Sequence, residues 1–197
     1  AHIPVHLGAM PTAVAAVLPF APFHPGDIVI LNDPYLGGTH LPDITMVSPV
    51  FLPPSPVRGR GAGGEGTLIG FLASRAHHAD VGGISPGSMP IAEELIQEGI
   101  VIPPIKLFEA GKLNQAVLDL LLRNMRAPGE RRGDLDAQIA AHRTGEDRLR
   151  EIAARYGAEQ AWRLMYELMD YAERMTRAAI AAVPDGEYTF EDWLTTT

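Results

Sequence analysis

The sequence of 197 residues is long enough for one substantial domain, and its hydrophobic content of 46% favours a folded core. Its net charge of -8 disfavours general nucleic-acid binding, because contacts to phosphates need a basic face. The chain has no cysteine, which excludes disulfides and thiolate metal sites, so any metal ligands must be histidine nitrogens and carboxylate oxygens.

No apolar run approaches the roughly 18 residues that a membrane-spanning helix needs. The first residues, AHIPVHLG, lack the basic region and apolar run of a signal peptide. We therefore expect a soluble, cytoplasmic protein that contacts no membrane. The chain begins without methionine and ends on FEDWLTTT, which is typical of a strand that has just begun, so we also expect a fragment of a longer polypeptide.

The first half of the chain predicts strands separated by glycine-rich loops. A short helix is expected over residues 11–20, because Pro11 suits the first turn of a helix. Residues 28–31 form a continuous β-branched and apolar run, which is typical of a strand covered on both faces. Further strands are expected over residues 43–51 and 67–81, on either side of a loop rich in proline and glycine at 52–66.

The second half predicts helices, because its apolar residues recur three and four positions apart. These residues fall into three groups: Leu118, Leu121, Leu122 and Met125; Leu149, Ile152, Ala153 and Tyr156; and Ala161, Leu164, Met165, Leu168, Ala172, Met175 and Ala179. Gly157 is placed to end the second helix, and the Met and Tyr positions of the third are expected to be core. After residues 184–186, GEYTFEDW alternates like a returning strand.

These patterns predict an α+β fold in which a mixed, β-rich part with glycine-rich loops precedes a helical segment. We expect a β-rich region that would carry a metal site at 1–110, a helical segment at 111–183 and the truncated start of a further strand region at 184–197.

Three of the seven histidines lie in two stretches next to glycine pairs, GGTHLPDITMVSP and SRAHHADVGG. His40 and Asp43 of the first stretch can converge on one point in a tight loop. With one histidine of the second stretch they would form a three-ligand site that leaves positions open, as a catalytic metal requires. Consecutive strand residues face opposite sides, so His77 and His78 cannot both join if the strand persists. Alternatively, these histidines cap backbone groups, since an HxxD spacing often arises by chance.

Three other residues are candidates for catalytic roles. Asp80 could orient a histidine ligand through its second ring nitrogen. Glu98 could be a general base, or it could end a short helix. Arg75 could hold an anionic substrate, or it could form a surface ion pair.

The remaining candidates have simpler alternatives. Asp33 could also orient a histidine, although Asp in an NDP sequence more often forms a turn. His2 and His6 could point into one cavity or pack near the start of the chain, and His24 and His142 are expected at the surface. No GxxxxGK[ST], GxGxxG or GxSxG motif is present in a suitable context, so the sequence predicts no nucleotide site or nucleophile elbow.

Three long stretches together resemble the hydantoinase B family: GDIVILNDPYLGGTHLPDITMVSPVF, ASRAHHADVGGISPGSMP and EELIQEGIVIPPIKL. This family includes N-methylhydantoinase B subunits, the second half of 5-oxoprolinase and the related subunit of acetone and acetophenone carboxylases. AHIPVHLGAMP and GDLDAQIAAHRTGEDRL look similar as well, so the resemblance spans nearly the whole chain. Family members are much longer than this chain, which agrees with a fragment.

The resemblance implies a division of labour in a hetero-oligomer. A hydantoinase A-type subunit with an actin-like ATPase fold would bind ATP and phosphorylate the substrate, and the B-type subunit would hold the metal that completes the reaction. In the carboxylase branch the ligands are the histidine and aspartate of an HxxD stretch and a later histidine. The matching positions here are His40, Asp43 and then His77 or His78.

We therefore expect the B-type subunit of an ATP-dependent cyclic amide hydrolase, with Mn, Fe, Zn or Mg as the divalent metal. Asp80, Glu98 and Arg75 are its expected catalytic residues. The alternatives are a subunit of an ATP-dependent ketone carboxylase and a structural module without metal.

Overall fold

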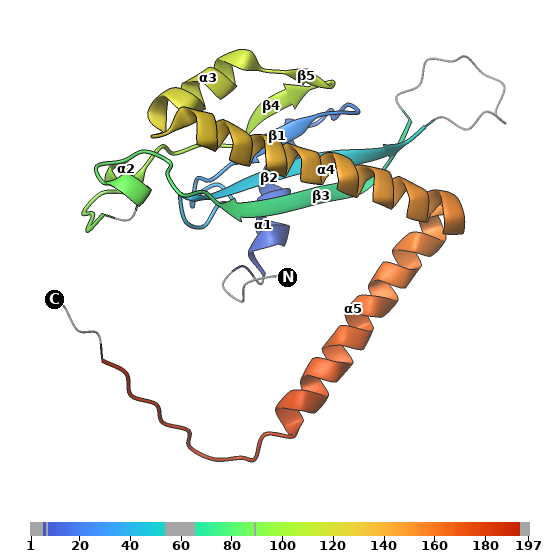
Figure 1. The fold of residues 1–197 in the computed structure, drawn as a ribbon. Helices are drawn as coiled ribbons and strands as arrows, with labels where there is room; N and C mark the ends of the chain where they lie inside the picture. The colour runs from blue at the N-terminus through green and yellow to red at the C-terminus, as the bar shows by residue number, and fades with distance from the viewer. Residues whose placement is uncertain (1–5, 7, 54–65, 89, 194–197) are drawn as a thin grey trace. The chain divides into compact units, whose positions relative to one another are not determined.

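The computed structural model describes residues 6, 8–53, 66–88 and 90–193 (Figure 1). The chain divides into two compact units, Ala1–Glu151 and Ile152–Thr197. His2 and most of the predicted loop at 52–66 lie outside the described residues. No helix in the described part of the chain is both long and apolar enough to cross a bilayer.

The first unit is built on an antiparallel sheet of five strands in the order β3-β2-β1-β4-β5. The strands are β1 (Ile28–Leu31), β2 (Asp43–Leu52), β3 (Thr67–His77), β4 (Ile105–Glu109) and β5 (Lys112–Leu113). The three predicted strands are confirmed, although β3 ends at His77 instead of continuing to residue 81. The β4–β5 hairpin lies in a segment for which no strand is predicted.

Both faces of β1 are buried, as its apolar run predicts. Val29 and Leu31 pack on one face in a cluster with α1 (Ala9–Val17). Ile28 and Ile30 point to the other face, into a cluster that includes residues of α3 and α4. The helix predicted at 11–20 is therefore confirmed, since α1 continues into the 3-10 turn Leu18–Phe20.

The helices that follow are α2 (Leu95–Glu98), α3 (Gln115–Asn124) and α4 (Pro128–Tyr156), after a short 3-10 turn at Pro86–Ser88. The inner face of α4 carries Leu135, Ile139 and His142, all of which are buried. The prediction that His142 lies at the surface is wrong, because its spacing of three and seven residues from the two aliphatic side chains places it on the same helix face. The α+β class is confirmed.

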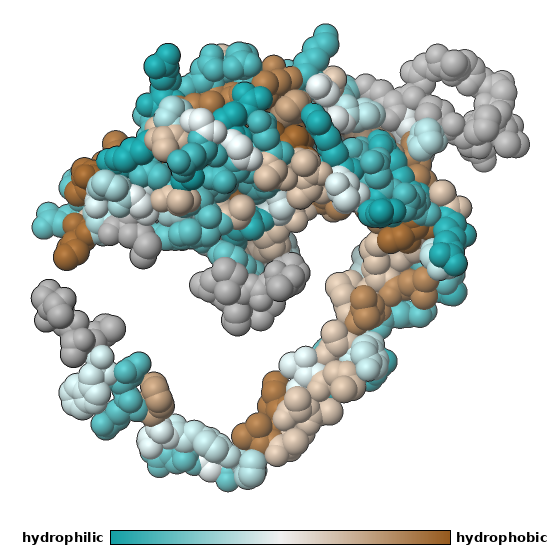
Figure 2. Space-filling model, in the orientation of Figure 1, coloured by the Kyte–Doolittle hydropathy of each residue, from teal (hydrophilic) through white to brown (hydrophobic). Residues whose placement is uncertain are grey.

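The second unit contains the end of α4 and α5 (Ala158–Ala181), separated by Gly157 with φ at 82°. Both predicted helices are confirmed. The prediction that the Met and Tyr residues of α5 are core is wrong, because they are 40% to 66% exposed: Met165, Tyr166, Met169, Tyr171 and Met175. Figure 2 shows apolar residues along the surface of α5. Within this unit, the described residues include no sheet and no second long helix that could cover them.

The described end of the second unit forms no strand, so the returning strand predicted in GEYTFEDW is wrong. A strand needs a neighbouring strand for its ladder of hydrogen bonds, and none lies among the described residues of this unit. Phe190 and Trp193 are instead exposed, and the Tyr188 hydroxyl donates to the Pro184 carbonyl at 2.6 Å.

Candidate metal centre

Three predicted ligands converge at one end of the sheet. Asp43 begins β2 and His77 ends β3, and the antiparallel register places these two residues directly opposite each other. His40 lies in the loop just before β2. One ligand atom from each of the three residues lies within 4.8 Å of the other two.

The carboxylate of Asp43 is central to this group. Its Oδ1 lies 2.9 Å from Nδ1 of His77, and its Oδ2 lies 3.8 Å from Nδ1 of His40. The two imidazole rings are 5.5 Å apart between centroids. Asp43 is buried, while the side chains of His40 and His77 are 39% and 48% exposed, so the group has one buried side and one open side.

This geometry fits a divalent cation. Metal–nitrogen and metal–oxygen bonds of about 2.0–2.2 Å place neighbouring ligand atoms roughly 3 to 3.5 Å apart. The separations of 2.9 and 3.8 Å are close to that range but involve different oxygens of Asp43, so a bound cation would draw the side chains together around it. Two imidazoles and one carboxylate also leave coordination positions free for water or substrate on the open side.

The loop that carries His40 is held by the polar residues before it. The Asn32 side chain donates to the Leu41 carbonyl at 2.8 Å and accepts from the Ile102 amide at 2.6 Å. Gly38 packs so tightly on this turn that an added Cβ would lie 2.1 Å from the Asn32 carbonyl oxygen. Asp33 accepts from the Tyr35 amide at 2.9 Å, which agrees with its predicted alternative as a turn-former.

His78 points away from this group. Strand β3 ends at His77, and the backbone amide of His78 donates to the Pro42 carbonyl. Its ring is only 2% exposed and lies 3.3 Å from the side-chain oxygen of Gln138 on α4. Burial lowers the pKa of His78, and the hydrogen bond to Gln138 only partly opposes this effect. The structure thus brings His77, and not His78, to the carboxylate.

Arg75 lies two residues before His77, so its side chain shares the same face of β3. Its Nε donates to the Thr45 hydroxyl at 2.8 Å, and its Nη2 lies 3.4 Å from the Gly37 carbonyl. Burial lowers the pKa of Arg75, while the charge of Asp43 opposes this effect. The guanidinium therefore lies near Asp43, and its role in holding an anionic substrate stays a prediction.

Two buried nitrogens in this neighbourhood have no hydrogen-bond partner among the described residues: Nη1 of Arg75 and Nδ1 of His6. His6 reaches the group from the segment before α1, and its Nε2 lies 3.8 Å from Oδ1 of Asp43. Buried polar nitrogens are rarely left unpaired, so these two suit a site that receives an oxygen-bearing ligand.

Asp80 belongs to a different network. Its carboxylate accepts from the backbone amides of Gly82, Gly87 and Arg126, and the Arg126 guanidinium lies 3.0 Å from Oδ2. Burial opposes ionisation, but these hydrogen bonds together lower the pKa of Asp80. None of these contacts orients a histidine.

Glu98 is half-buried at the end of α2, as its simpler alternative predicts. Its backbone packs against Gly83, where an added Cβ would lie 2.6 Å from the Glu98 carbonyl carbon. Neither Glu98 nor Asp80 belongs to the group of convergent ligands, and their catalytic roles stay predictions.

Comparisons with known proteins agree on one family. The family model described as Hydantoinase B/oxoprolinase matches residues 1–197. The putative B subunit of the D-/L-hydantoinase from Pseudomonas sp. (strain NS671) is 40% identical over 174 residues, which cover 87% of this chain and 27% of that protein.

Two solved structures are similar in both fold and sequence. The ATP-dependent caprolactamase from Pseudomonas jessenii has a TM-score of 0.77 and 38% identity, covering 93% of this chain and 30% of that chain. Acetone carboxylase in its nucleotide-free structure has a TM-score of 0.70 and 27% identity, covering 83% and 21%. The chain spans less than a third of the length of the curated relatives it matches.

Proposed function

The chain belongs to the hydantoinase B/oxoprolinase family, and on that premise we propose that it carries the metal centre of an ATP-dependent hydrolase acting on cyclic amides. The observation that carries the proposal is the convergence of His40, Asp43 and His77. The similarity to an ATP-dependent caprolactamase supports the choice of substrate class, since that enzyme's name specifies a lactam.

The ligand set suits Mn²⁺, Fe²⁺, Zn²⁺ or Mg²⁺, because it offers nitrogen and oxygen atoms and the chain has no thiolate. A divalent cation bound there would supply a Lewis acid, which lowers the pKa of a water molecule and stabilises negative charge on a carbonyl oxygen. Without the cation, Asp43 would hold the two histidines close together, since each of its oxygens faces one imidazole, and all three residues would serve as ligands when the cation binds.

An amide carbonyl is a poor electrophile, so we propose that a separate ATPase of the hydantoinase A type binds ATP and phosphorylates the carbonyl oxygen before this centre acts. Arg75 would then bind the phosphorylated substrate, because a guanidinium matches the geometry of phosphate oxygens. Its unpartnered Nη1 lies on the same strand face as His77 and supports this role. The protein would accordingly work as part of a hetero-oligomer.

The contacts of Asp80 and Glu98 support different roles for these two residues. Glu98 remains the candidate general base, since it is half-buried. Asp80 has four hydrogen-bond donors around its carboxylate, which favours a role in holding the loop at residues 82–88.

A ketone carboxylase component is the second candidate, and the similarity to acetone carboxylase favours it. In that reaction the same centre would stabilise the oxygen of a ketone enolate. The two activities differ in one requirement, because a carboxylase consumes bicarbonate and a hydrolase does not.

The test is to express the full-length protein with its ATPase partner and to measure lactam or hydantoin ring opening with ATP and each metal. We expect activity without bicarbonate, and a loss of about 100-fold or more in His77→Ala, since metal ligands are required for catalysis. Arg148→Gln, an exposed change on α4, is the matched control and should leave the rate unchanged. Strict dependence on bicarbonate would exclude the hydrolase.

A further inference from the structure

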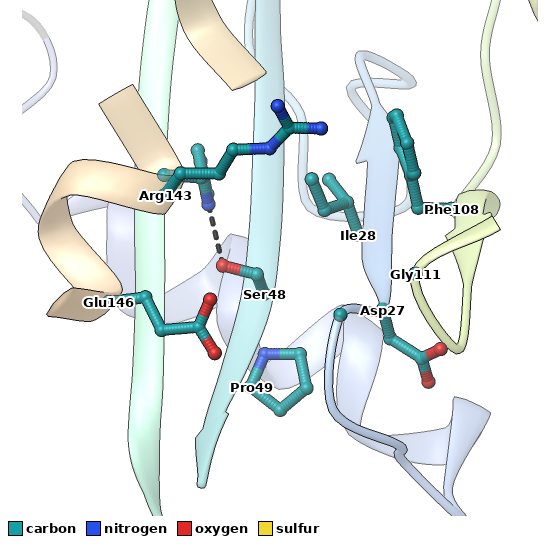
Figure 3. A pocket seen from close by; sticks show the side chains of 10 residues that line it. Asp27, Ile28, Ser48, Pro49, Phe108, Gly111, Arg143 and Glu146 are labelled. Carbon is teal, nitrogen blue, oxygen red and sulfur yellow. Dashed lines mark hydrogen bonds between the residues drawn. The ribbon is translucent and has the colours of Figure 1, made fainter. Parts of the chain in front are cut away.

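A pocket lies on the face of the sheet opposite the candidate metal centre. Ser48 is five positions after Asp43 on β2, so the two side chains point to opposite faces. The pocket has a volume of about 190 Å³ and is lined by residues that include Ile28, Ser48, Phe108, His142, Arg143 and Glu146 (Figure 3). All of them belong to the first unit.

The Ser48 hydroxyl belongs to a chain of hydrogen bonds. His142 lies between two serines, with Nδ1 2.7 Å from the Ser48 hydroxyl and Nε2 2.7 Å from the Ser74 hydroxyl. Burial lowers the pKa of His142 to about 4, so its ring is neutral near pH 7 and carries a single N–H.

Gln138 adds a donor to this chain of hydrogen bonds. Its side-chain nitrogen donates to the Ser74 hydroxyl oxygen at 3.1 Å. In the His142 tautomer whose Nε2 accepts from Ser74, Nδ1 carries the hydrogen and donates to Ser48. The hydrogen of the Ser48 hydroxyl is then available for an acceptor in the pocket.

Two side chains of opposite charge extend from α4 on either side of Ser48, as Figure 3 shows. Arg143 is exposed and has no ion-pair partner within the described part of the chain. One oxygen of Glu146 pairs with Arg150 at 2.7 Å, which leaves its second oxygen for another donor. The carboxylate of Asp27 also lines the pocket, but it is already bound by Lys106 and the Ala110 amide.

We propose that this pocket binds a small zwitterionic amino acid with a short apolar side chain. The ligand carboxylate would accept hydrogen bonds from Arg143 and the Ser48 hydroxyl, and the ligand ammonium would donate to Glu146. The apolar side chain would lie against Ile28 and Phe108. The volume corresponds to about six water molecules at roughly 30 Å³ each, which suits a ligand the size of valine.

The test is to titrate the isotopically labelled full chain with L-valine and to follow its backbone amide signals by NMR. Two matched probes separate the charges: isovalerate lacks the ammonium group, and isobutylamine lacks the carboxylate. We expect L-valine to shift the amide signals of Gly26, Ile28 and Gly111. Both probes should bind at least about tenfold more weakly than L-valine, because each loses a charged hydrogen bond.

Arg143→Gln should weaken L-valine binding by a similar factor, because the ligand carboxylate loses a charged hydrogen-bond donor. The side chain is exposed, so we expect the variant to fold. Arg148→Gln, five residues further along α4 and outside the pocket, should leave L-valine binding unchanged. Thermal unfolding of both variants checks that they fold. The proposal is overturned if millimolar L-valine shifts none of these amides, if Arg143→Gln binds as the parent does, or if isovalerate binds as tightly as L-valine. It stands independently of the proposed function.

Discussion

At the scale of single residues, the neighbours His77 and His78 have opposite surroundings. The first is half-exposed beside Asp43, and the second is buried against Gln138 of α4. Strand alternation predicts that only one of them joins the site, but it cannot select between them. The choice depends on where β3 ends and on the position of α4, which are tertiary features that a local pattern does not contain.

The buried His142 predicts a dependence of stability on pH. Burial lowers its pKa to about 4 from an ordinary value of 6.5, so the unfolded chain binds the proton more readily between these values. This contribution to stability is complete above about pH 6.5 and is lost as the pH falls towards 4. We expect the protonation of His142 to lower the free energy of unfolding by up to about 3 kcal/mol as the pH falls over that range.

Urea unfolding of the parent and of His142→Gln between pH 7 and pH 4.5 checks this effect. The free energy of the variant should fall less steeply with decreasing pH. A residual slope of the same sign is expected from His78, whose pKa burial also lowers. Equal slopes for the two proteins would contradict the assignment.

Asp80 is predicted to orient a histidine and Glu98 to act as a general base, but their contacts predict different effects on stability. Asp80→Ala would leave the Gly82 and Gly87 amides and Arg126 without their acceptor, so we expect a loss of about 2–4 kcal/mol in the free energy of unfolding. Glu98→Ala should cost well under about 1 kcal/mol, as expected of a half-buried side chain that has no hydrogen bond or ion pair among the described residues. Chemical denaturation of both variants provides the comparison, and an unchanged stability of Asp80→Ala would favour its catalytic role.

At the scale of elements, the conformation of the loop before β2, which carries the candidate ligand His40, depends on Gly38. Gly38→Ala would bring a Cβ within 2.1 Å of the Asn32 carbonyl, so the loop that carries His40 must shift. We expect both lower stability and weaker metal binding in this variant. Gly133→Ala on α4 meets no atom within 4 Å and should raise the free energy of unfolding by about 0.5–1 kcal/mol.

Thermal unfolding and metal titration of the two glycine variants measure these effects. Gly38→Ala with the metal affinity of the parent would show that the position of His40 does not depend on this turn.

The strands and helices that were predicted correctly have strong local signals, such as the continuous apolar run of β1 and the three-and-four spacing in α3 and α5. The β4–β5 hairpin was missed, although Ala110 and Gly111 both adopt positive φ, as a two-residue hairpin turn requires. Ala-Gly is a weaker turn signal than Asn-Gly, and β5 has only two residues. The pairing with β1, which stabilises this hairpin, is not visible in the local sequence.

At the scale of the whole molecule, buried apolar residues are concentrated in the first unit. Leu135 on α4 is fully buried, whereas Leu168 on α5 is 64% exposed. Helical spacing predicts an apolar face for both helices, but it cannot tell whether anything covers that face. This explains why the core assignment of α5 was wrong while its helix was predicted correctly.

The two leucines provide a direct test of this distribution. Leu135→Ala should lower the free energy of unfolding by about 2–5 kcal/mol, whereas Leu168→Ala should change it by less than about 1 kcal/mol. Urea unfolding of the purified chain measures both values. A large loss in Leu168→Ala would mean that the α5 face is buried in solution.

The family was identified from long stretches of sequence, and the match of its model to residues 1–197 confirms it. The individual ligands could be narrowed only to four residues, because their convergence depends on the register between β2 and β3. The family assignment and the strand register together lead to one central claim, that His40, Asp43 and His77 bind a divalent cation.

Titration of the purified chain with Co²⁺ and Zn²⁺ tests that claim most directly, with absorption spectroscopy and calorimetry as measurements. The parent should bind one ion, and His40→Ala, Asp43→Asn and His77→Ala should each bind it at least about tenfold more weakly, whereas His78→Gln should retain the affinity of the parent. Metal binding by His77→Ala and Asp43→Asn that equals that of the parent would contradict the account.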